Sequence, residues 1–414
     1  MHCCGGPGAS GTDNQASDRW QRVSRGFKAK TDDSRRRPGQ GVLESELLGV
    51  LQAHASGRLN DPAKAYRDLL DRGCCHPLVL ANLGQLEFLE GDLESASKHL
   101  KAATELDQAN AGFWSLLGTI ERRKGNLSEA KVLLERSLDL EPAHFGAWLA
   151  LSVVLHDLGD LQAAFKACEN AVALEPRSAG AHANMAMVQL ALGCYHEAES
   201  ASRRSITLDE SLPEAHLNLG KALHALRDWR GAARAHQQAL SVRPDFVPAL
   251  TGLGNALRAS DQIDVAALAF QRAIEVDPNY FQAHSNLAIT LRSQGELTTA
   301  LEHAMQAFSL NAGSADVVSN IAVILHDLGD IERANSYYER ALELQADHAD
   351  ARFGYAMALL QLANYEQGWS EYEWRFAHNE ANPIVRVIPG LERWEGVASP
   401  CVDELVILHE QGLG

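Results

Sequence analysis

The segment VVLHDLGD at residues 153–160 returns almost unchanged as VILHDLGD at residues 323–330. The two copies begin 170 residues apart, which is five times 34. Written in rows of 34 residues from Pro77, the chain fills eight complete rows over residues 77–348 without an insertion or deletion, and a ninth, partial row covers residues 349–378. A fixed period of this length predicts a repeat protein, in which each unit buries its apolar face against its neighbours.

Two positions of the row, here called columns, hold small residues throughout. The eighth column consists of Gly84, Gly118, Ser152, Ala186, Gly220, Gly254, Ala288, Ala322 and Ala356. The twentieth consists of Ala96, Ala130, Ala164, Ala198, Ala232, Ala266, Ala300, Ala334 and Gly368. Small side chains at these two columns allow two antiparallel helices to pack closely, so each row predicts a pair of short helices.

Glycine and proline mark the ends of these helices. The fifteenth column predicts a left-handed residue after the first helix, because six rows carry glycine there: Gly91, Gly125, Gly159, Gly193, Gly295 and Gly329. The thirty-second column predicts the end of the second helix, because four rows carry proline there: Pro142, Pro176, Pro244 and Pro278. Each row therefore predicts a helix–turn–helix unit.

This pattern resembles the tetratricopeptide repeat, whose W-x-x-L-G motif appears as Trp114 to Gly118. The resemblance implies an all-α, right-handed superhelical solenoid of eight repeats at 77–348, with a short C-terminal linker and one strand after it. Residues 43–76 are expected to form a degenerate N-terminal repeat, since Val50 and Pro62 break the two small columns. A worn terminal repeat is the usual cap of such an array.

Composition excludes several classes of protein. The formal net charge of −17 argues against a nucleic-acid partner, and no run of eighteen apolar residues could span a membrane. Residues 1–42 are rich in Gly, Ser and Arg without apolar periodicity, which predicts a disordered basic tail. The seven cysteines form no C-x-x-C motif and are odd in number, so we expect neither a disulfide framework nor a zinc site, and a reducing, cytoplasmic location.

The sixth column is asparagine in five of nine rows, at Asn82, Asn184, Asn218, Asn286 and Asn320. An asparagine amide carries two donors and one acceptor, so it can pair with the N–H and C=O of a peptide backbone. A series of them along the first helices would hold an extended chain without depending on its sequence. The alternative is a structural role, in which the asparagines cap helices or bridge adjacent repeats.

This asparagine series resembles the repeat region of the protein O-linked N-acetylglucosamine transferases. The resemblance implies that the five asparagines bind substrate polypeptide in a concave groove. Four rows depart from the pattern and interrupt the series: Leu116, Ala150, Gly252 and Gly354. Histidines recur at the fourth and twelfth columns, but equivalent positions of adjacent repeats lie about 10 Å apart, too far for shared coordination, so we expect no metal site.

The period breaks after Tyr365. Five aromatic residues within Tyr365–Phe376 predict a cap on the array or a contact with a second domain. A Pro/Gly-rich linker at 379–403 follows, and then the apolar run LVIL within 404–414 predicts a buried strand ending in the turn glycines Gly412 and Gly414.

The segments GWSEYEWRF and LVILHEQGLG resemble the junction of bacterial repeat-bearing, heptosyltransferase-like glycosyltransferases. The resemblance implies that residues 404–414 begin a GT-B-like catalytic domain that is truncated here. We therefore expect this chain to have no catalytic residue and no cofactor, whereas the full-length protein would use a nucleotide-sugar donor.

Two functions follow. The first is a protein-interaction module that presents polypeptide substrate to a glycosyltransferase domain. The alternative is a free-standing tetratricopeptide scaffold or adaptor without enzymatic activity. In both, the expected partner is a protein or extended polypeptide.

Overall fold

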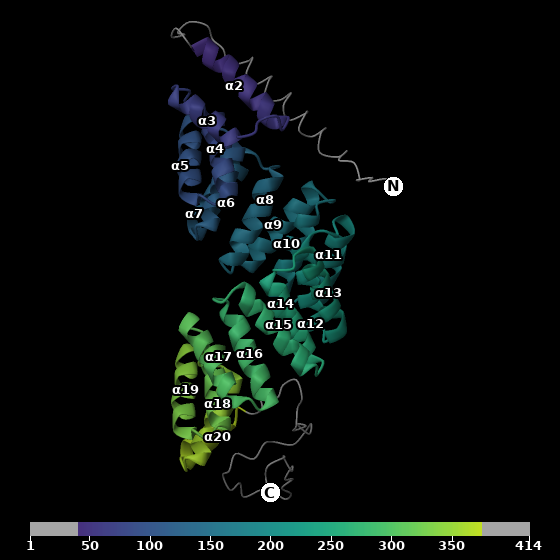
Figure 1. Cartoon of the computed structure of the whole chain (residues 1–414), viewed down its shortest axis with the longest axis vertical. Helices are drawn as coiled ribbons and strands as arrows, with labels where there is room; N and C mark the ends of the chain where they lie inside the picture. Colours follow the sequence, from purple (N-terminus) through teal and green to yellow (C-terminus); the bar gives the residue numbers. More distant parts are fainter. Residues whose placement is uncertain (1–39, 375–414) are drawn as a thin grey trace, which may run out of the picture. The chain divides into compact units, whose positions relative to one another are not determined.

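The structure is a computed structural model that describes residues 40–374. Within this range the backbone forms helices and no strand (Figure 1). The expected linker at 379–403, the expected strand at 404–414 and nearly all of the expected tail at 1–42 lie outside the described residues. The all-α fold class predicted from the 34-residue period is confirmed.

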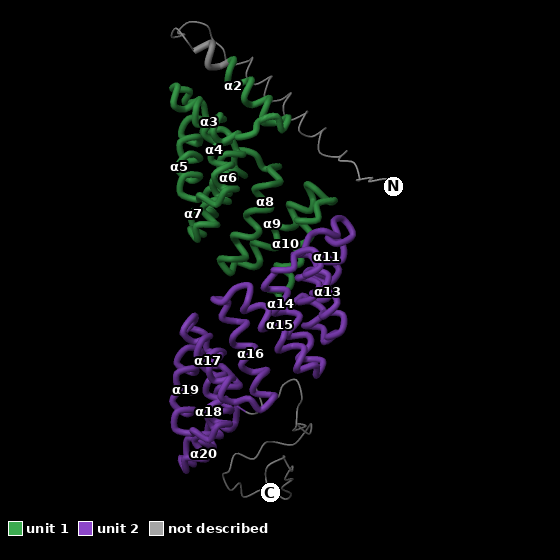
Figure 2. Tube along the Cα trace, viewed as in Figure 1, with its two compact units in different colours: residues 1–192 green, residues 193–414 purple. Residues whose placement is uncertain are grey.

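The chain divides into two compact units, residues 1–192 and 193–414 (Figure 2). The helices of the first unit are α2 (Gln40–Ala55), α3 (Pro62–Asp71), α4 (Pro77–Glu90), α5 (Leu93–Leu106), α6 (Ala111–Arg123), α7 (Leu127–Leu140), α8 (Phe145–Asp157), α9 (Leu161–Leu174) and α10 (Ala179–Ala191). Those of the second are α11 (Tyr195–Leu208), α12 (Pro213–Ala225), α13 (Trp229–Val242), α14 (Val247–Ala259), α15 (Ile263–Val276), α16 (Phe281–Gln294), α17 (Leu297–Leu310), α18 (Ala315–Asp327), α19 (Ile331–Leu344), α20 (Ala349–Gln361) and α21 (Tyr365–Tyr372).

Aspartate caps begin several of these helices, and residues with positive φ follow the ends of the first helices, as the fifteenth column predicts. The second helices α5, α9, α13 and α19 begin after an aspartate whose carboxylate accepts a backbone N–H three residues on, as Asp228 does from Gly231 at 2.8 Å. All six glycines of the fifteenth column have positive φ. The column keeps this conformation even where glycine is missing, since Arg227, Asp261 and Ala363 have φ of 63°, 63° and 61°. Position in the repeat, and not residue type alone, sets the turn.

The small columns lie inside the helix pairs. The alanines of the twentieth column, from Ala96 to Ala334, are fully buried. At the eighth column, a Cβ built on Gly118 would lie 2.7 Å from Cγ of Leu134, and one built on Gly254 would lie 2.6 Å from Cε1 of Phe270. Neither distance leaves room for a methyl group, so the glycines are required by the close approach of the helices.

The eighth column faces the twenty-fourth, and the sizes of the two residues compensate in seven of the nine rows. Glycine at column eight faces a large residue in four rows: Leu100, Leu134, His236 and Phe270. In three rows where column eight is Ser or Ala, column twenty-four is small: Cys168, Ser202 and Ala304. The last two rows depart from this, because Ala322 and Ala356 are paired with Tyr338 and Tyr372, and the ring of Tyr338 lies against Gly354 of the next repeat. The volume between the two helices is therefore shared between two positions rather than fixed at one.

The first helices form the inner wall of each unit. Successive first helices contact one another, as α6 does α8 and α14 does α16, whereas successive second helices within a unit contact each other slightly at most. Because the first helices lie closer together, each unit curves toward them. We use "inner wall" for α4, α6, α8 and α10 in the first unit and for α12, α14, α16, α18 and α20 in the second.

The two ends of the described array differ from the middle. Helices α2 and α3 cover the expected degenerate repeat, and Tyr66 of α3 is fully buried with its hydroxyl 2.8 Å from Nδ1 of His54. At the other end, Tyr372 of α21 packs against Phe353, while Trp369 makes an edge contact with Tyr372 and remains 54% exposed. The last helix thus carries a large apolar side chain that this part of the chain does not cover.

Candidate functional site

The inner wall of the first unit contains a cavity of about 470 Å³. It is lined by apolar residues of α2, α3, α4 and α6 and by three amide side chains, Asn82, Gln85 and Asn110. Asn82 donates its amide N–H to the carbonyl of Leu78 in its own helix at 2.8 Å, which orients the side chain along the cavity. A hollow with an apolar floor and a few polar groups is the usual form of a binding site.

The second unit has an inner-wall cavity of about 510 Å³ between α16, α18 and α20. Asn320 lines it together with the ion pair of Arg292 and Asp327, whose Nε and Oδ2 are 2.5 Å apart. Tyr338 of α19 contributes a buried ring, and burial raises the pKa of its hydroxyl, so this phenol is neutral. The cavity therefore offers both charged and uncharged polar groups.

The asparagine column has mixed surroundings. Asn184 donates to the carbonyl of Leu149 at 3.2 Å and to Oγ of Ser152 at 3.1 Å, and Asn320 donates to Oγ of Ser285 at 2.9 Å. These bonds join α10 to α8 and α18 to α16, so the amide nitrogens of both residues bridge adjacent first helices. Each residue keeps its carbonyl oxygen as an acceptor.

The other two asparagines differ from these. Asn218 is 7% exposed, which places it in the packed interior of the wall. Asn286 is half-buried, and its side chain makes no hydrogen bond within the described residues. Binding of polypeptide by the five asparagines remains a prediction, and Asn82, Asn286 and Asn320 are the members best positioned for it.

Two gaps in the asparagine column have a steric cause. A Cβ at Gly252 would lie 2.5 Å from Cε1 of His236, and one at Gly354 would collide with the ring of Tyr338. Each ring projects from the second helix of one repeat toward the first helix of the next. Glycine replaces asparagine there because the preceding ring already occupies the space.

The fourth column has a structural role that the sequence did not reveal. Its side-chain N–H groups donate to the carbonyl six residues earlier, as in Trp148 to Pro142 at 2.8 Å. The same bond is made by Trp114, His182, His216, His284 and Arg352. For the histidines this bond uses Nε2–H, so Nδ1 is an acceptor in the neutral ring. The shared feature is a ring or guanidinium N–H, which a search by residue type misses.

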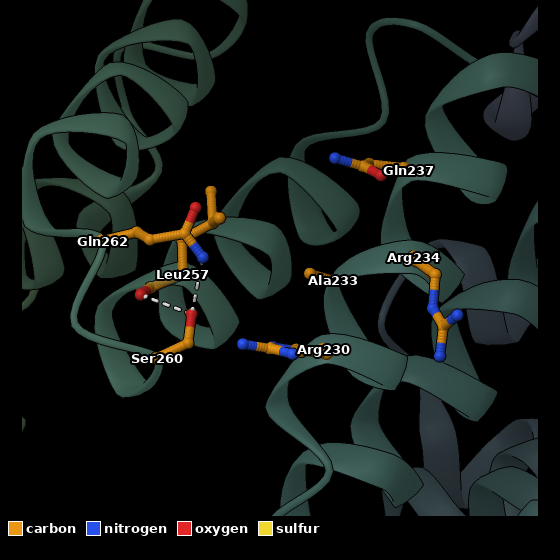
Figure 3. A pocket seen from close by; sticks show the side chains of 7 residues that line it. All are labelled: Arg230, Ala233, Arg234, Gln237, Leu257, Ser260 and Gln262. Atoms are coloured by element: carbon orange, nitrogen blue, oxygen red, sulfur yellow. Dashed lines mark hydrogen bonds between the residues drawn. The ribbon is translucent and has the colours of Figure 1, made fainter.

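A further cavity of about 510 Å³ lies between α13 and the turn that joins α14 to α15 (Figure 3). Arg230, Arg234 and Gln237 come from α13, and Ser260 and Gln262 from the turn. In the close-up, Arg230 extends toward Ser260, whose hydroxyl donates to the carbonyl of Leu257 at 3.0 Å. This hollow is polar and open, and it lies apart from the asparagine column.

Within the described part of the chain, no group of three or more His, Cys, Asp or Glu side chains is arranged so that it could hold a metal ion. None of the described helices is long and apolar enough to cross a membrane. The four cysteines of this part, Cys74, Cys75, Cys168 and Cys194, form no disulfide. Gly412 and Gly414, expected to form a ligand-binding turn, lie outside the described residues.

Comparison with known proteins identifies the repeat. Models of the tetratricopeptide repeat match residues 79–110, 115–182, 215–246, 247–280, 269–302 and 321–368, together more than half of the chain. A search of curated proteins finds no match.

Solved structures agree on the fold. A tetratricopeptide repeat protein from Parabacteroides merdae is 18% identical with a TM-score of 0.50, over 60% of this chain and 98% of that one. The structure of the APC/C hetero-tetramer Cut9–Hcn1 gives 16% identity and a TM-score of 0.58, over 83% of this chain and 67% of the matched one.

Proposed function

This chain belongs to the tetratricopeptide-repeat family, and from that premise we propose that it is a protein-interaction module whose inner wall binds an extended polypeptide. The observation that supports the proposal is the pair of hollows on the inner wall, each with an asparagine of the sixth column at its edge. Amide side chains spaced one repeat apart suit a peptide backbone, because they pair with N–H and C=O groups regardless of the side chains that the peptide carries.

Binding along first helices is consistent with the mixed roles of the asparagines. A side chain that bridges two repeats through its nitrogen, as Asn320 does, is held in a fixed rotamer. Its carbonyl oxygen is then pre-organised to accept a backbone N–H from a ligand, which lowers the entropy cost of binding. Structural bridging and polypeptide binding are therefore compatible at the same residue.

The finer proposal is that this module is the substrate-recognition arm of a protein glycosyltransferase that uses a nucleotide-sugar donor in the cytoplasm. Its support is the sequence resemblance of residues 365–414 to the junction of repeat-bearing glycosyltransferases, together with the exposed Trp369 at the end of the array. The alternative is an adaptor of the same fold without catalysis. Sugar transfer to protein acceptors by the protein that contains this chain distinguishes the two.

The binding proposal is tested with the double variant Asn82→Ala, Asn286→Ala. Neither residue bridges two repeats in the described structure, so the fold should be retained. We expect the affinity for a fluorescent, uncharged, extended peptide to fall by about tenfold, because each lost hydrogen bond contributes about 0.5–1.5 kcal/mol.

The matched control is Asn279→Ala, at an exposed residue in the turn between α15 and α16. This substitution should leave peptide affinity unchanged. If the double variant also bound the peptide as tightly as the wild-type chain, the inner wall would not be the binding surface.

A further inference from the structure

The hollow between α13 and the turn that joins α14 to α15 has an equivalent in the first unit, at α5 and the turn that joins α6 to α7 (Figure 3). The eighteenth, twenty-second and twenty-fifth columns of one row and the fourteenth of the next line both. In the hollow of α13 these columns are Arg230, Arg234, Gln237 and Ser260. In the hollow of α5, which has a volume of about 460 Å³, they are Glu94, Lys98, Lys101 and Lys124. The hollow is therefore a feature of the repeat, and its charge differs between repeats.

The hollow of α5 is neutralised by carboxylates of the chain itself. Nζ of Lys124 lies 3.0 Å from Oε2 of Glu94, and these two residues, 30 positions apart, belong to columns fourteen and eighteen. A third repeat makes the same contact with an uncharged donor, since Nε2 of Gln294 donates to Oδ1 of Asp264 at 2.7 Å. An acidic residue at column eighteen that pairs with column fourteen of the next row is thus a recurring contact.

Arg230 reverses the charge of this contact. Column eighteen, which is acidic at Glu94 and Asp264, is Arg230 in the row that holds α13. The residue 30 positions later is Ser260, whose hydroxyl already donates to the carbonyl of Leu257 at 3.0 Å. Figure 3 shows Arg230 extending from α13 toward Ser260. The guanidinium therefore lies in the hollow at a place where two other repeats have a carboxylate.

Arg234 adds a second cation to the same hollow, one turn further along α13. Within the described residues, neither Arg230 nor Arg234 makes an ion pair or a side-chain hydrogen bond, and no carboxylate lines the hollow. The aspartate that precedes α13, Asp228, is engaged as a helix cap and accepts the N–H of Gly231 at 2.8 Å. Like charges one turn apart on a helix repel each other, so the two guanidiniums favour an anion that comes from outside the chain.

The charge of the whole row points the same way. Residues 213–246 contain five Lys/Arg and three Asp/Glu, and this is the one complete row in which basic residues outnumber acidic ones. The chain as a whole carries a formal net charge of −17. A basic surface on an acidic protein attracts anions to one place.

Two guanidiniums match the charge of a phosphate monoester. At pH 7 such a group carries a charge of about −1.5 to −2 and has three acceptor oxygens, so it can take paired hydrogen bonds from both arginines. A carboxylate or a phosphodiester carries a single charge and would leave one arginine without a counter-ion. Gln237, whose side chain points across the hollow in Figure 3, adds an amide donor.

We propose that Arg230, Arg234 and Gln237 form a binding site for a phosphate monoester, in a hollow whose equivalent at α5 is neutralised by the ion pair of Glu94 and Lys124. The recognised group is the same whether it belongs to a phosphorylated side chain of a partner protein or to a small phosphorylated metabolite. The site lies apart from the asparagine column, so it is independent of the proposed function and adds a second ligand to it.

The test compares a fluorescent peptide that contains phosphoserine with the same peptide that contains serine, at physiological ionic strength. We expect the wild-type chain to bind the phosphorylated peptide at least about tenfold more tightly. The double variant Arg230→Gln, Arg234→Gln removes both cations and should abolish this preference. The double variant Arg230→Glu, Ser260→Lys installs the ion pair of α5 in the hollow of α13 and should abolish it as well.

The matched control is the double variant Arg204→Gln, Arg272→Gln, which removes two exposed arginines from α11 and α15 and changes the net charge by the same amount. It should keep the preference for the phosphorylated peptide. Arg230 and Arg234 are exposed too, so their replacement should leave the fold intact. An equal affinity of the wild-type chain for both peptides, or a preference that survives in Arg230→Gln, Arg234→Gln, would overturn the site.

Two further probes separate the sources of the phosphate. Free O-phosphoserine is titrated while the side-chain NMR signals of the arginines are followed. An affinity equal to that of the phosphorylated peptide supports a small metabolite as the ligand, whereas a weaker affinity supports a phosphorylated protein. A single-stranded oligonucleotide that binds more tightly than either probe would contradict the site, because its phosphodiesters lack the second charge.

Discussion

The imidazole of His236 is enclosed by two helices that have no side chain at the point of contact. Gly220 and Gly252 both face it, and its exposure is 1%. Burial, reinforced by the charges of His224 and Lys221, lowers the pKa of His236 to about 4. The ring is therefore neutral in the folded protein at neutral pH, and protonating it requires placing a charge where water does not reach.

This makes the stability of the second unit dependent on pH. The unfolded chain takes up a proton on His236 near pH 6.5 but the folded chain only near pH 4, so stability should fall as the pH drops through this window. The loss attributable to this residue is about 3 kcal/mol. His236→Phe removes the titrating group and keeps a ring, as Phe270 does opposite Gly254.

Chemical denaturation between pH 7 and pH 4 measures the effect. The wild-type chain should lose more stability over this range than His236→Phe. Parallel pH profiles for the two proteins would contradict the assignment of a buried, neutral imidazole.

At the scale of the elements, packing is determined within each helix pair. Residues of columns eight and twenty-four meet across each pair, and Gly254 can only be glycine while Phe270 faces it. Gly254→Ala should destabilise the chain by about 1–3 kcal/mol through overpacking. The double variant Gly254→Ala, Phe270→Ala should be more stable than the sum of the two single effects predicts, by at least about 1 kcal/mol. The reason is that Phe270→Ala removes the ring with which the new methyl group would collide.

Urea denaturation of the two single variants and the double variant gives this coupling energy. Gly49→Ala is the control, since a Cβ on this glycine of α2 would meet no atom within 4 Å and should not destabilise the helix. Additive effects of Gly254→Ala and Phe270→Ala would mean that the two columns do not share one volume.

The helix pairs could be predicted from the sequence because each constraint on them is visible in a single column of the repeat. Small residues at the eighth and twentieth columns, and glycine at the fifteenth, are visible one column at a time, and the structure confirms burial of the first two and positive φ at the third. The twenty-fourth column gave no signal, because it holds residues as different as Ser202, Phe270 and Tyr338. Its constraint applies to a pair of positions, which a column-by-column comparison cannot detect.

The candidate site was predictable to a similar extent. The sixth column located residues on the inner wall, and two of them line cavities there. Bridging of adjacent repeats was the alternative that the sequence left open for this column, and Asn184 and Asn320 do bridge, through the hydroxyls of Ser152 and Ser285. Which asparagines bridge could not be predicted from the column, because it depends on a residue of the preceding first helix. The absence at Arg258, within the described residues, of the ion pair that Arg122 and Arg292 make with an aspartate was not predicted either, because that aspartate would lie on the next first helix.

At the scale of the molecule, stability should be local, because each repeat contacts mainly its neighbours. Leu134→Ala removes a fully buried side chain of the first unit and should cost about 2–5 kcal/mol. We expect faster amide hydrogen exchange in α6–α9 and unchanged exchange in α18–α20, measured by mass spectrometry. Uniform loss of protection across both units would indicate that the described chain unfolds as one cooperative body.

The edge contact between Trp229 and His224, with ring centroids 4.8 Å apart, gives this region an optical signal. An imidazolium quenches indole fluorescence more strongly than a neutral imidazole does, so the emission of Trp229 depends on the protonation state of its neighbour. A negative group placed beside His224 would raise the pKa of its imidazole, favour the protonated ring and so lower the fluorescence of Trp229. The fluorescence of Trp229 therefore reports the charge of the neighbouring His224 ring.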